Sequence, residues 1–169
     1  MFKRVRFFSG QILSAQDFQV EQQYQLDKRR LSNRYLHGTG IVAGLHVTVE
    51  SDTVIVSPGF ALDPMGNEIV IERPTPVDTK PCANEVCYLF LRYTESGTDP
   101  VPAGNDRTEF SRITESFILT VQDGGAAQPD AVCLGRLLRQ SDGWTVDGGT
   151  GRHDMVKRGT PDSASLLDG

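Results

Sequence analysis

The stretch that decides the fold is residues 7–46, FFSGQILSAQDFQVEQQYQLDKRRLSNRYLHGTGIVAGLH. An aromatic lead-in, a long segment with a basic end and a glycine-rich corner follow one another without a break. Ser14 and Asp17 have the spacing of a capping box, in which a hydroxyl and a carboxylate bind free N–H groups of the first helical turn. We therefore expect a helix to begin at this point.

The predicted helix continues to about residue 36. From Ala15 to Leu36 the sequence has no Gly or Pro, and Lys and Arg fill the second half, which matches the negative end of the helix dipole. Gly38 and Gly40 then favour an end to the helix. One apolar stripe recurs at helical spacing, and we expect it to pack against a sheet. Its members are Val20, Tyr24, Leu31 and Tyr35.

The sequence after residue 40 predicts strands. Its apolar runs are short, rich in Val, Ile, Leu, Phe and Tyr, and separated by turn-forming residues. We expect an α+β, mainly β fold, with one long N-terminal helix packed on an antiparallel β-sandwich or small barrel. Residues 96–107 contain two prolines and two glycines, which predicts a surface loop.

Length and composition predict the domain organisation. The chain has 169 residues, of which 38% are hydrophobic and 23% are charged, as in ordinary globular domains. Residues 1–147 are expected to form a single β-rich domain that includes the helix at about 14–36. Residues 148–169 are polar and lack periodicity, which predicts a flexible arm or a linker. No apolar run approaches the roughly 20 residues of a membrane span, so direct membrane insertion is not expected.

Charge is distributed unevenly along the chain. The net charge of -5 argues against nucleic acid as a partner, because phosphates require a basic surface. Residues 1–40 hold seven Lys or Arg against three Asp or Glu, and the remainder holds ten against nineteen. A basic N-terminal part joined to an acidic body predicts head-to-tail or partner contacts through complementary charge. The alternative is a solvated helix face.

Metal and cofactor sites are not expected. Cys82 and Cys87 have four residues between them, which is outside the usual zinc-knuckle spacing, and Cys133 lies in an apolar run. Three cysteines without an export signal predict reduced thiols that behave as small buried hydrophobes. His37 and His46 are too far apart to share one helical face.

Enzymatic activity is not expected either, and no catalytic residue is predicted. The glycine-rich segment 38–44 follows a helix and enters a strand, the reverse of the order in phosphate-binding loops. Asp63, Glu68 and Glu72 have the residue types of a glycosidase pair, but a Pro-Met-Gly-Asn turn between the first two favours turn and solvent roles. Trp144 can stack on a sugar or pack on its own hairpin, and the second role is the more common.

Partner binding is the function that the residues favour. Arginines at the basic end of the helix can form forked bonds with the carboxylates of a neighbour, or they can simply be solvated. Phenylalanines before and within the first helical turn can anchor a neighbour or pack internally at the start of the helix. The predicted partner-binding residues are Phe7, Phe8, Gln11, Phe18, Arg29, Arg30, Arg34 and His37.

An ordered pattern of residues, spread over roughly residues 2–145, also resembles a known family. The pattern consists of Phe7–Leu13 (FFSGQIL), Asp17-Phe18, Tyr24, Arg29-Arg30, Asn33-Arg34, Leu36-His37-Gly38, Gly44-Leu45, Pro58–Asp63 (PGFALD) and Gly66-Asn67-Glu68. It resembles a family of proteins found with phage-tail-like contractile injection systems. It is more loosely similar to the N-terminal shoulder domain of the type VI secretion baseplate adaptor, in which an aromatic-Gly-x-Leu segment and an Asp/His-Phe-Gln segment precede a long helix and a β-sandwich.

The resemblance implies a noncatalytic structural or assembly subunit at the baseplate of such a particle or at its periphery. The implied partners are further copies of the chain, in a trimer or a hexameric ring, and other baseplate, spike or fibre proteins. The implied location is the cytoplasm, with assembly into a phage tail-like particle that can be released. The chain has no room for the adaptor's further domains, so a link to a membrane complex is not expected. The alternative function is a receptor- or carbohydrate-binding module of a tail fibre or shoulder.

Overall fold

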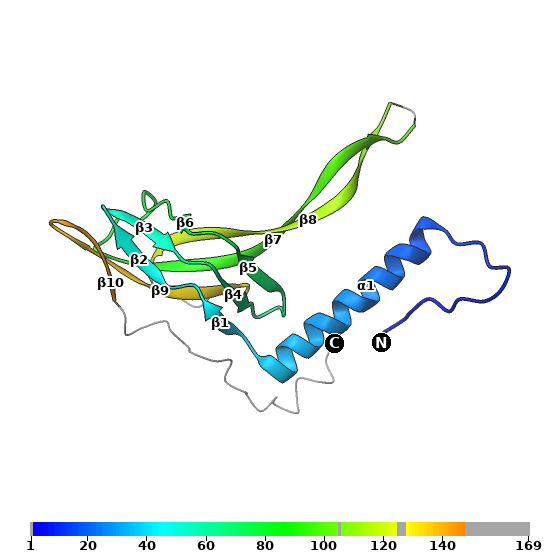
Figure 1. The fold of residues 1–169 in the computed structure, drawn as a ribbon, viewed down its shortest axis with the longest axis horizontal. Helices are drawn as coiled ribbons and strands as arrows, with labels where there is room; N and C mark the ends of the chain where they lie inside the picture. Colours follow the sequence, from blue (N-terminus) through cyan, green and yellow to red (C-terminus); the bar gives the residue numbers. More distant parts are fainter. Residues whose placement is uncertain (1, 105, 125–127, 148–169) are drawn as a thin grey trace.

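The structure is a computed structural model that describes residues 2–104, 106–124 and 128–147. Figure 1 shows a curled β body from which a helix and a long hairpin project. The predicted C-terminal arm or linker, residues 148–169, lies outside the described residues. The elements are α1 (Ala15–Ser32), the π-helical turn η1 (Asn33–His37), β1 (Gly40–Gly44), β2 (Val47–Glu50), β3 (Thr53–Val56), β4 (Gly59–Leu62), β5 (Glu68–Ile71), β6 (Thr75–Pro76), β7 (Val86–Pro102), β8 (Thr108–Asp123), β9 (Ala131–Gln140) and β10 (Gly143–Asp147).

The predicted helix is confirmed, together with the signals at its two ends. The hydroxyl of Ser14 accepts a hydrogen bond from the N–H of Asp17 at 3.3 Å, and the Asp17 carboxylate accepts one from the N–H of Ser14 at 2.8 Å. The N–H and the hydroxyl of Ser14 both donate to the Asp17 carboxylate and stabilise its ionised form, so the pKa of Asp17 is lowered. At the other end Gly38 has a φ of 79°, and its N–H donates to the carbonyl of Asn33 at 2.9 Å.

Three antiparallel sheets surround one hydrophobic core. Their strand orders are β1-β4-β5, β2-β3-β6 and β10-β9-β7-β8. All three sheets contribute buried side chains to a single cluster, so they form one body. The fold class predicted from the sequence, α+β and mainly β, is therefore confirmed. The largest fully buried apolar side chains are Leu45, Ile69, Ile71, Leu89, Leu91 and Leu137.

The position of α1 differs from the expectation that its apolar stripe is buried against a sheet. No residue of α1 is buried, and Val20, Tyr24 and Leu31 of the stripe are only half-buried. Figure 1 shows the first turns of α1 directed away from the β body. Apolar residues are too sparse among the glutamines and charges of this helix to hold it along a sheet. No helix in the described part of the chain is long and apolar enough to cross a membrane.

A hairpin replaces the surface loop that the sequence predicts at residues 96–107. Strands β7 and β8 pair from Cys87 opposite Asp123 out to Pro102 opposite Thr108, and Figure 1 shows their far ends well beyond the body. Strand β9 covers the other side of β7 only as far as Arg92. Beyond that point β7 has no second neighbouring strand in the described structure, so prolines that lack an N–H donor are tolerated there.

The prediction of reduced thiols is wrong for Cys82 and Cys87, although both are buried in the core as expected. Cys82 and Cys87 are joined in a disulfide, with Cα atoms 6.1 Å apart, which is within the range such bonds require. With Asp123 they also form a cluster of potential metal ligands, but sulfurs bonded to each other are not free thiolates. Cys133 is a free, half-buried thiol, and burial raises its pKa.

The core assignment predicts a clear contrast between two substitutions. Leu89→Ala is expected to lower the free energy of unfolding by about 2–5 kcal/mol, because it removes a fully buried side chain and leaves a cavity. Ile113→Ala, at a position on β8 that is 67% exposed, is expected to change it by less than about 0.5 kcal/mol. Urea denaturation followed by circular dichroism measures both. Equal losses in the two variants would contradict the core described here.

Candidate functional site

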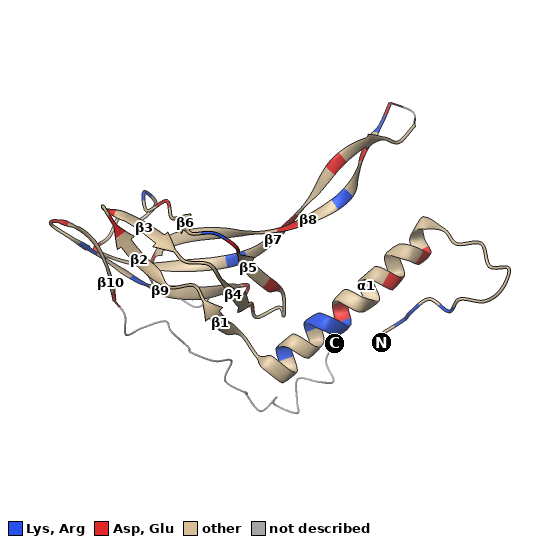
Figure 2. Ribbon diagram, viewed as in Figure 1, with Lys and Arg blue, Asp and Glu red and all other residues tan. Residues whose placement is uncertain are grey.

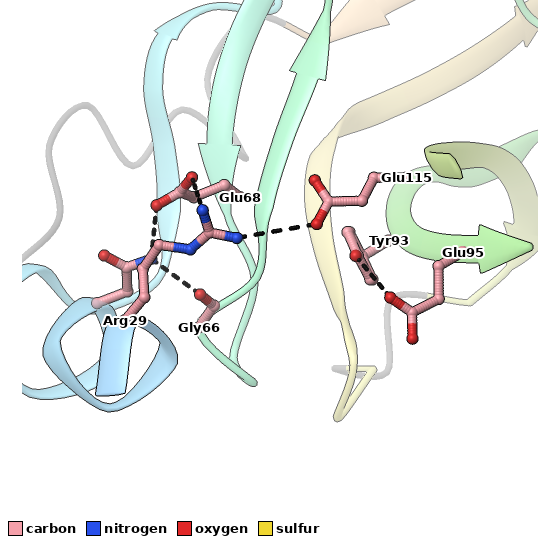
Figure 3. Close-up of polar contacts among 7 residues, drawn as sticks. Arg29, Gly66, Glu68, Tyr93, Glu95 and Glu115 are labelled. Carbon is pink, nitrogen blue, oxygen red and sulfur yellow. Dashed lines mark hydrogen bonds and ion pairs between the residues drawn. The ribbon is translucent and has the colours of Figure 1, made fainter. Parts of the chain in front are cut away.

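The candidate site is built around the junction where the end of α1 meets the β body. Arg29 lies between Glu68 of β5 and Glu115 of β8, and its guanidinium nitrogens are 3.7 Å and 3.8 Å from the two carboxylates (Figure 3). All three side chains are partly exposed, so each ion pair contributes at most about 1 kcal/mol after solvent screening. The pairs therefore orient the helix relative to two different sheets more than they stabilise the fold.

A buried contact fixes the same junction. The side-chain amide of Asn33, which is 7% exposed, donates to the carbonyl of Gly66 at 2.9 Å and to the Glu68 carboxylate at 3.1 Å. Gly66 has a φ of 84°, and a Cβ built there would lie 2.3 Å from the carbonyl oxygen of Arg30. The helix backbone thus packs directly against the turn that contains Gly66. Only glycine combines this φ with this close approach.

Asp63 holds the turn that presents Gly66. Its buried carboxylate accepts hydrogen bonds from the N–H groups of Met65 at 2.9 Å and Asn67 at 2.8 Å, and from the Asn67 side-chain amide at 2.8 Å. The turn role predicted for Asp63 is confirmed, although the residue is buried instead of solvent-exposed. Glu68 binds Arg29 and Asn33 instead of forming a catalytic pair with Asp63.

The base of the hairpin adds a second cluster of carboxylates to the junction. The hydroxyl of Tyr93 donates to Glu95 at 3.0 Å, and Glu95 lies opposite Glu115 in the β7–β8 register (Figure 3). Burial raises the pKa of Tyr93 well above its ordinary value, and the adjacent Glu95 and Glu115 raise it further. Tyr93 therefore remains a hydrogen-bond donor at neutral pH, and the glutamates give this part of the hairpin negative charge.

The predicted aromatic group lies at the end of α1 away from the β body. Phe7, Phe8 and Phe18 are 57%, 64% and 57% exposed. Gln11 closes a turn beside them, because its N–H donates to the carbonyl of Phe8 at 3.2 Å and its side-chain oxygen accepts from the N–H of Phe8 at 3.3 Å. Ile12 is 93% exposed in the same segment and is missing from the predicted set. Its place in the same lead-in, FFSGQIL, as the predicted phenylalanines was the available signal.

The predicted basic group lies at the other end of α1, as the blue segments of the helix in Figure 2 show. Arg34 and His37 are exposed, and the Arg34 guanidinium lies 5.6 Å from the centre of the Tyr35 ring. Arg30 is half-buried beside Gly66. The rise of a helix puts Phe18 and Arg29 about 17 Å apart. The structure therefore does not bring the predicted residues together at one point.

The hairpin carries a further set of exposed apolar residues that the sequence prediction missed, and three of them, Val101, Phe110 and Ile113, lie in its far part. Phe110 on β8 is 63% exposed, and its ring lies over Gly97 of β7. This surface was not predicted, because a loop was expected at residues 96–107. The Val, Ile, Phe and Thr content of residues 108–123 does favour a strand. The exposed apolar residues of the hairpin are Val86, Val101, Phe110, Ile113 and Ile118.

Trp144 does not offer a sugar-stacking surface. It is 7% exposed in β10, and the Arg139 guanidinium of the neighbouring strand β9 lies 5.1 Å from the centre of its ring. Trp144 also belongs to the core cluster. The more common role, packing on its own hairpin, is therefore the one that the structure shows.

Comparison with known proteins shows similarity at the level of the fold. No protein-family model and no curated protein sequence matches the chain. Solved structures do match, and each of the three described next covers 87% of this chain. A chain of the baseplate complex from the type VI secretion system matches with a TM-score of 0.53 at 15% identity, a chain of the TssK-TssF-TssG baseplate subcomplex with 0.53 at 15%, and the crystal structure of TssK with 0.56 at 14%.

The similarity extends over only part of those proteins. This chain spans 58%, 60% and 41% of the three matched chains, respectively. The resemblance to a type VI secretion baseplate protein, inferred from the sequence pattern, is thus confirmed for the fold. The structural neighbours of the chain are baseplate proteins of the type VI secretion system.

Two glycine substitutions test the junction. Gly66→Ala places a Cβ against the Arg30 carbonyl, so it is expected to displace the end of α1 and to speed hydrogen exchange of the amides at residues 29–38. Gly10→Ala is a matched control, because Gly10 has the same φ of 84° but open space around it. Mass-spectrometric hydrogen exchange measures both variants. The same exchange rates in Gly66→Ala and the wild type would contradict the described contact.

Proposed function

We propose that this chain is a noncatalytic assembly subunit of a contractile injection system baseplate, or of its periphery. Its N-terminal arm, defined as residues 2–13, and the first turns of α1 dock onto neighbouring subunits. The fold likeness to type VI secretion baseplate chains supports this role. The projection of the arm and helix from the β body supplies the surfaces that docking requires (Figure 1).

The observation that carries the proposal is a group of large apolar side chains left exposed on one projecting segment. Phe7, Phe8, Ile12 and Phe18 are each more than half exposed, and all lie at the arm or the adjoining end of α1. Exposed apolar residues are ordinary when they are scattered singly, but several within one short projecting segment indicate an interaction surface. Aromatic side chains are also enriched among residues that dominate binding energy in interfaces.

The remaining predicted residues divide between positioning and contact. Arg29 orients α1 through Glu68 and Glu115, and Gln11 closes the turn that presents Phe8. Arg34 and His37 are exposed at the body end of the helix, where they form a separate contact surface to which Arg34 adds positive charge. A partner with carboxylates facing this end would form charge-assisted hydrogen bonds with Arg34.

A noncatalytic role fits the way in which the charged groups of the junction are used. Asp63 closes a turn, Glu68 binds Asn33 and Arg29, and Tyr93 binds Glu95. Each contact positions a segment of the chain. The carbohydrate-binding alternative has no support from Trp144, whose ring is buried and covered by Arg139.

Particle incorporation tests the proposed function. Cells that lack the chain are complemented with wild type, with Phe7→Ser/Phe8→Ser/Phe18→Ser, or with Val42→Ser, and contractile particles are purified and probed for the protein. Wild type is expected to copurify at the baseplate end. The triple variant is expected to be depleted by at least about tenfold, because losing more than about 1.4 kcal/mol of binding energy has this effect.

Val42→Ser is the control for that experiment, because Val42 is 45% exposed on the β body, away from the arm. It is expected to be incorporated like wild type. Wild type that is absent from the particles would overturn the assembly role. Full incorporation of the triple variant would overturn the assignment of the docking surface to the arm.

A further inference from the structure

An open groove of about 450 Å³ lies beside the junction, between β5 and β8. The alternate positions 68, 70 and 72 of β5 and the residue after it line one side, together with positions 73 and 75, whereas β8 contributes the consecutive positions 115–117. Alternate residues of a strand project from one face, and consecutive residues line its edge. The groove therefore has the outer face of β5 as its floor and the edge of β8 as one wall.

The wall formed by β8 is an open sheet edge. Within the described residues β8 pairs with β7 on one side, and no strand is paired to its other side. The backbone N–H and C=O groups of such an edge can bind an extended segment as an added strand. Val70, 56% exposed on the floor, offers that segment an apolar contact.

The charge of the groove favours a basic occupant. Three glutamates line it, at positions 68, 72 and 115, and Arg73 is the basic residue of the lining. Arg29 contacts two of these glutamates at one end, and Glu95 lies opposite Glu115 on the adjoining strand. Carboxylates thus outnumber guanidinium groups here, so the surface attracts a cationic segment.

The first part of the N-terminal arm has the matching chemistry. Residues 2–8, FKRVRFF, contain three cations in seven positions, and no helix or strand is assigned to them. Lys3, Arg4 and Arg6 are exposed, and none of them belongs to an ion pair found in the described structure. In an extended strand Arg4 and Arg6 would share one face about 7 Å apart, which is the spacing of successive outward residues on β5.

No described residue of the arm of the same copy lines this groove. The arm begins at the outer end of α1, where Ser14 is roughly 22 Å from Arg29 along the helix axis. It then returns beside its own helix, with the ring of Phe2 5.1 Å from the ammonium of Lys28. Figure 1 shows the arm as a loop between the outer end of α1 and the N-terminus.

We propose that the groove between β5 and β8 binds residues 2–8 of a second copy of the chain, as a strand added to the edge of β8. This inference rests on the proposed assembly role and names one of its partners. Arm and groove are different surfaces, so the contact is head-to-tail and can close into a ring of copies. Because charge attraction contributes to it, the association weakens as salt is raised.

Two variants test the contact, one with an altered arm and the other with an altered groove. Arg4→Glu/Arg6→Glu reverses the charge of the arm and keeps the groove. Val70→Arg/Glu72→Arg reverses the charge of the groove and keeps the arm, and both positions lie outside the Arg29 and Asn33 contacts. Sedimentation velocity of each full chain, alone and mixed in equal amounts, measures the assembly. Circular dichroism melts verify that both variants fold.

The wild-type chain is expected to self-associate, and each variant is expected to be monomeric at the same concentration. An equal mixture of the two variants is expected to associate again, because the intact arm of one fits the intact groove of the other, and the reversed arm and reversed groove also carry opposite charges. A monomeric wild type, unchanged assembly of either variant, or a mixture that stays monomeric would overturn the inference. Wild type that enters particles but fails this test would remove the self-docking contact alone and leave the assembly role standing.

Discussion

The close contact between the end of α1 and the Gly66 turn is the constraint on which the rest of the structure depends. The amide of Asn33 binds the Gly66 carbonyl, and the Arg30 carbonyl occupies the space that a Cβ at residue 66 would need. Because no residue of α1 itself is buried, this short contact, supported by the Arg29 ion pairs, sets the direction of the whole helix. The arm is carried outward as a consequence.

The same junction also determines what the β body presents beside the helix. Arg29 reaches both β5 and β8, so the helix, the Gly66 turn and the base of the long hairpin meet at one place. The acid-lined groove starts there, while the arm joins α1 at its far end and returns beside the helix as far as Lys28. One copy thus displays two complementary surfaces that it does not bring together itself. This separation is typical of a subunit that assembles with neighbours.

Sequence reasoning predicted the features that local chemistry determines. The capping box at Ser14, the glycine end of the helix and the mainly β class all follow from short-range rules, and the ordered residue pattern indicated the fold likeness. It failed where long-range contacts decide. Pro100 and Pro102 favoured a loop, because the sequence does not reveal that this part of β7 pairs with β8 alone and therefore tolerates proline. The sparse apolar stripe of α1 was mistaken for a buried face, and the Arg29 ion pairs join residues that are 39 and 86 positions apart.

A distance measurement across the junction tests the central claim most directly. Nitroxide labels carried by unnatural amino acids at Gln19 on α1 and Asp142 between β9 and β10, both exposed, can be measured by double electron-electron resonance. A helix held by the Asn33 and Gly66 contact predicts one narrow distance distribution in the wild-type chain. A broad distribution would contradict the account, because it would mean that α1 has no fixed direction relative to the β body.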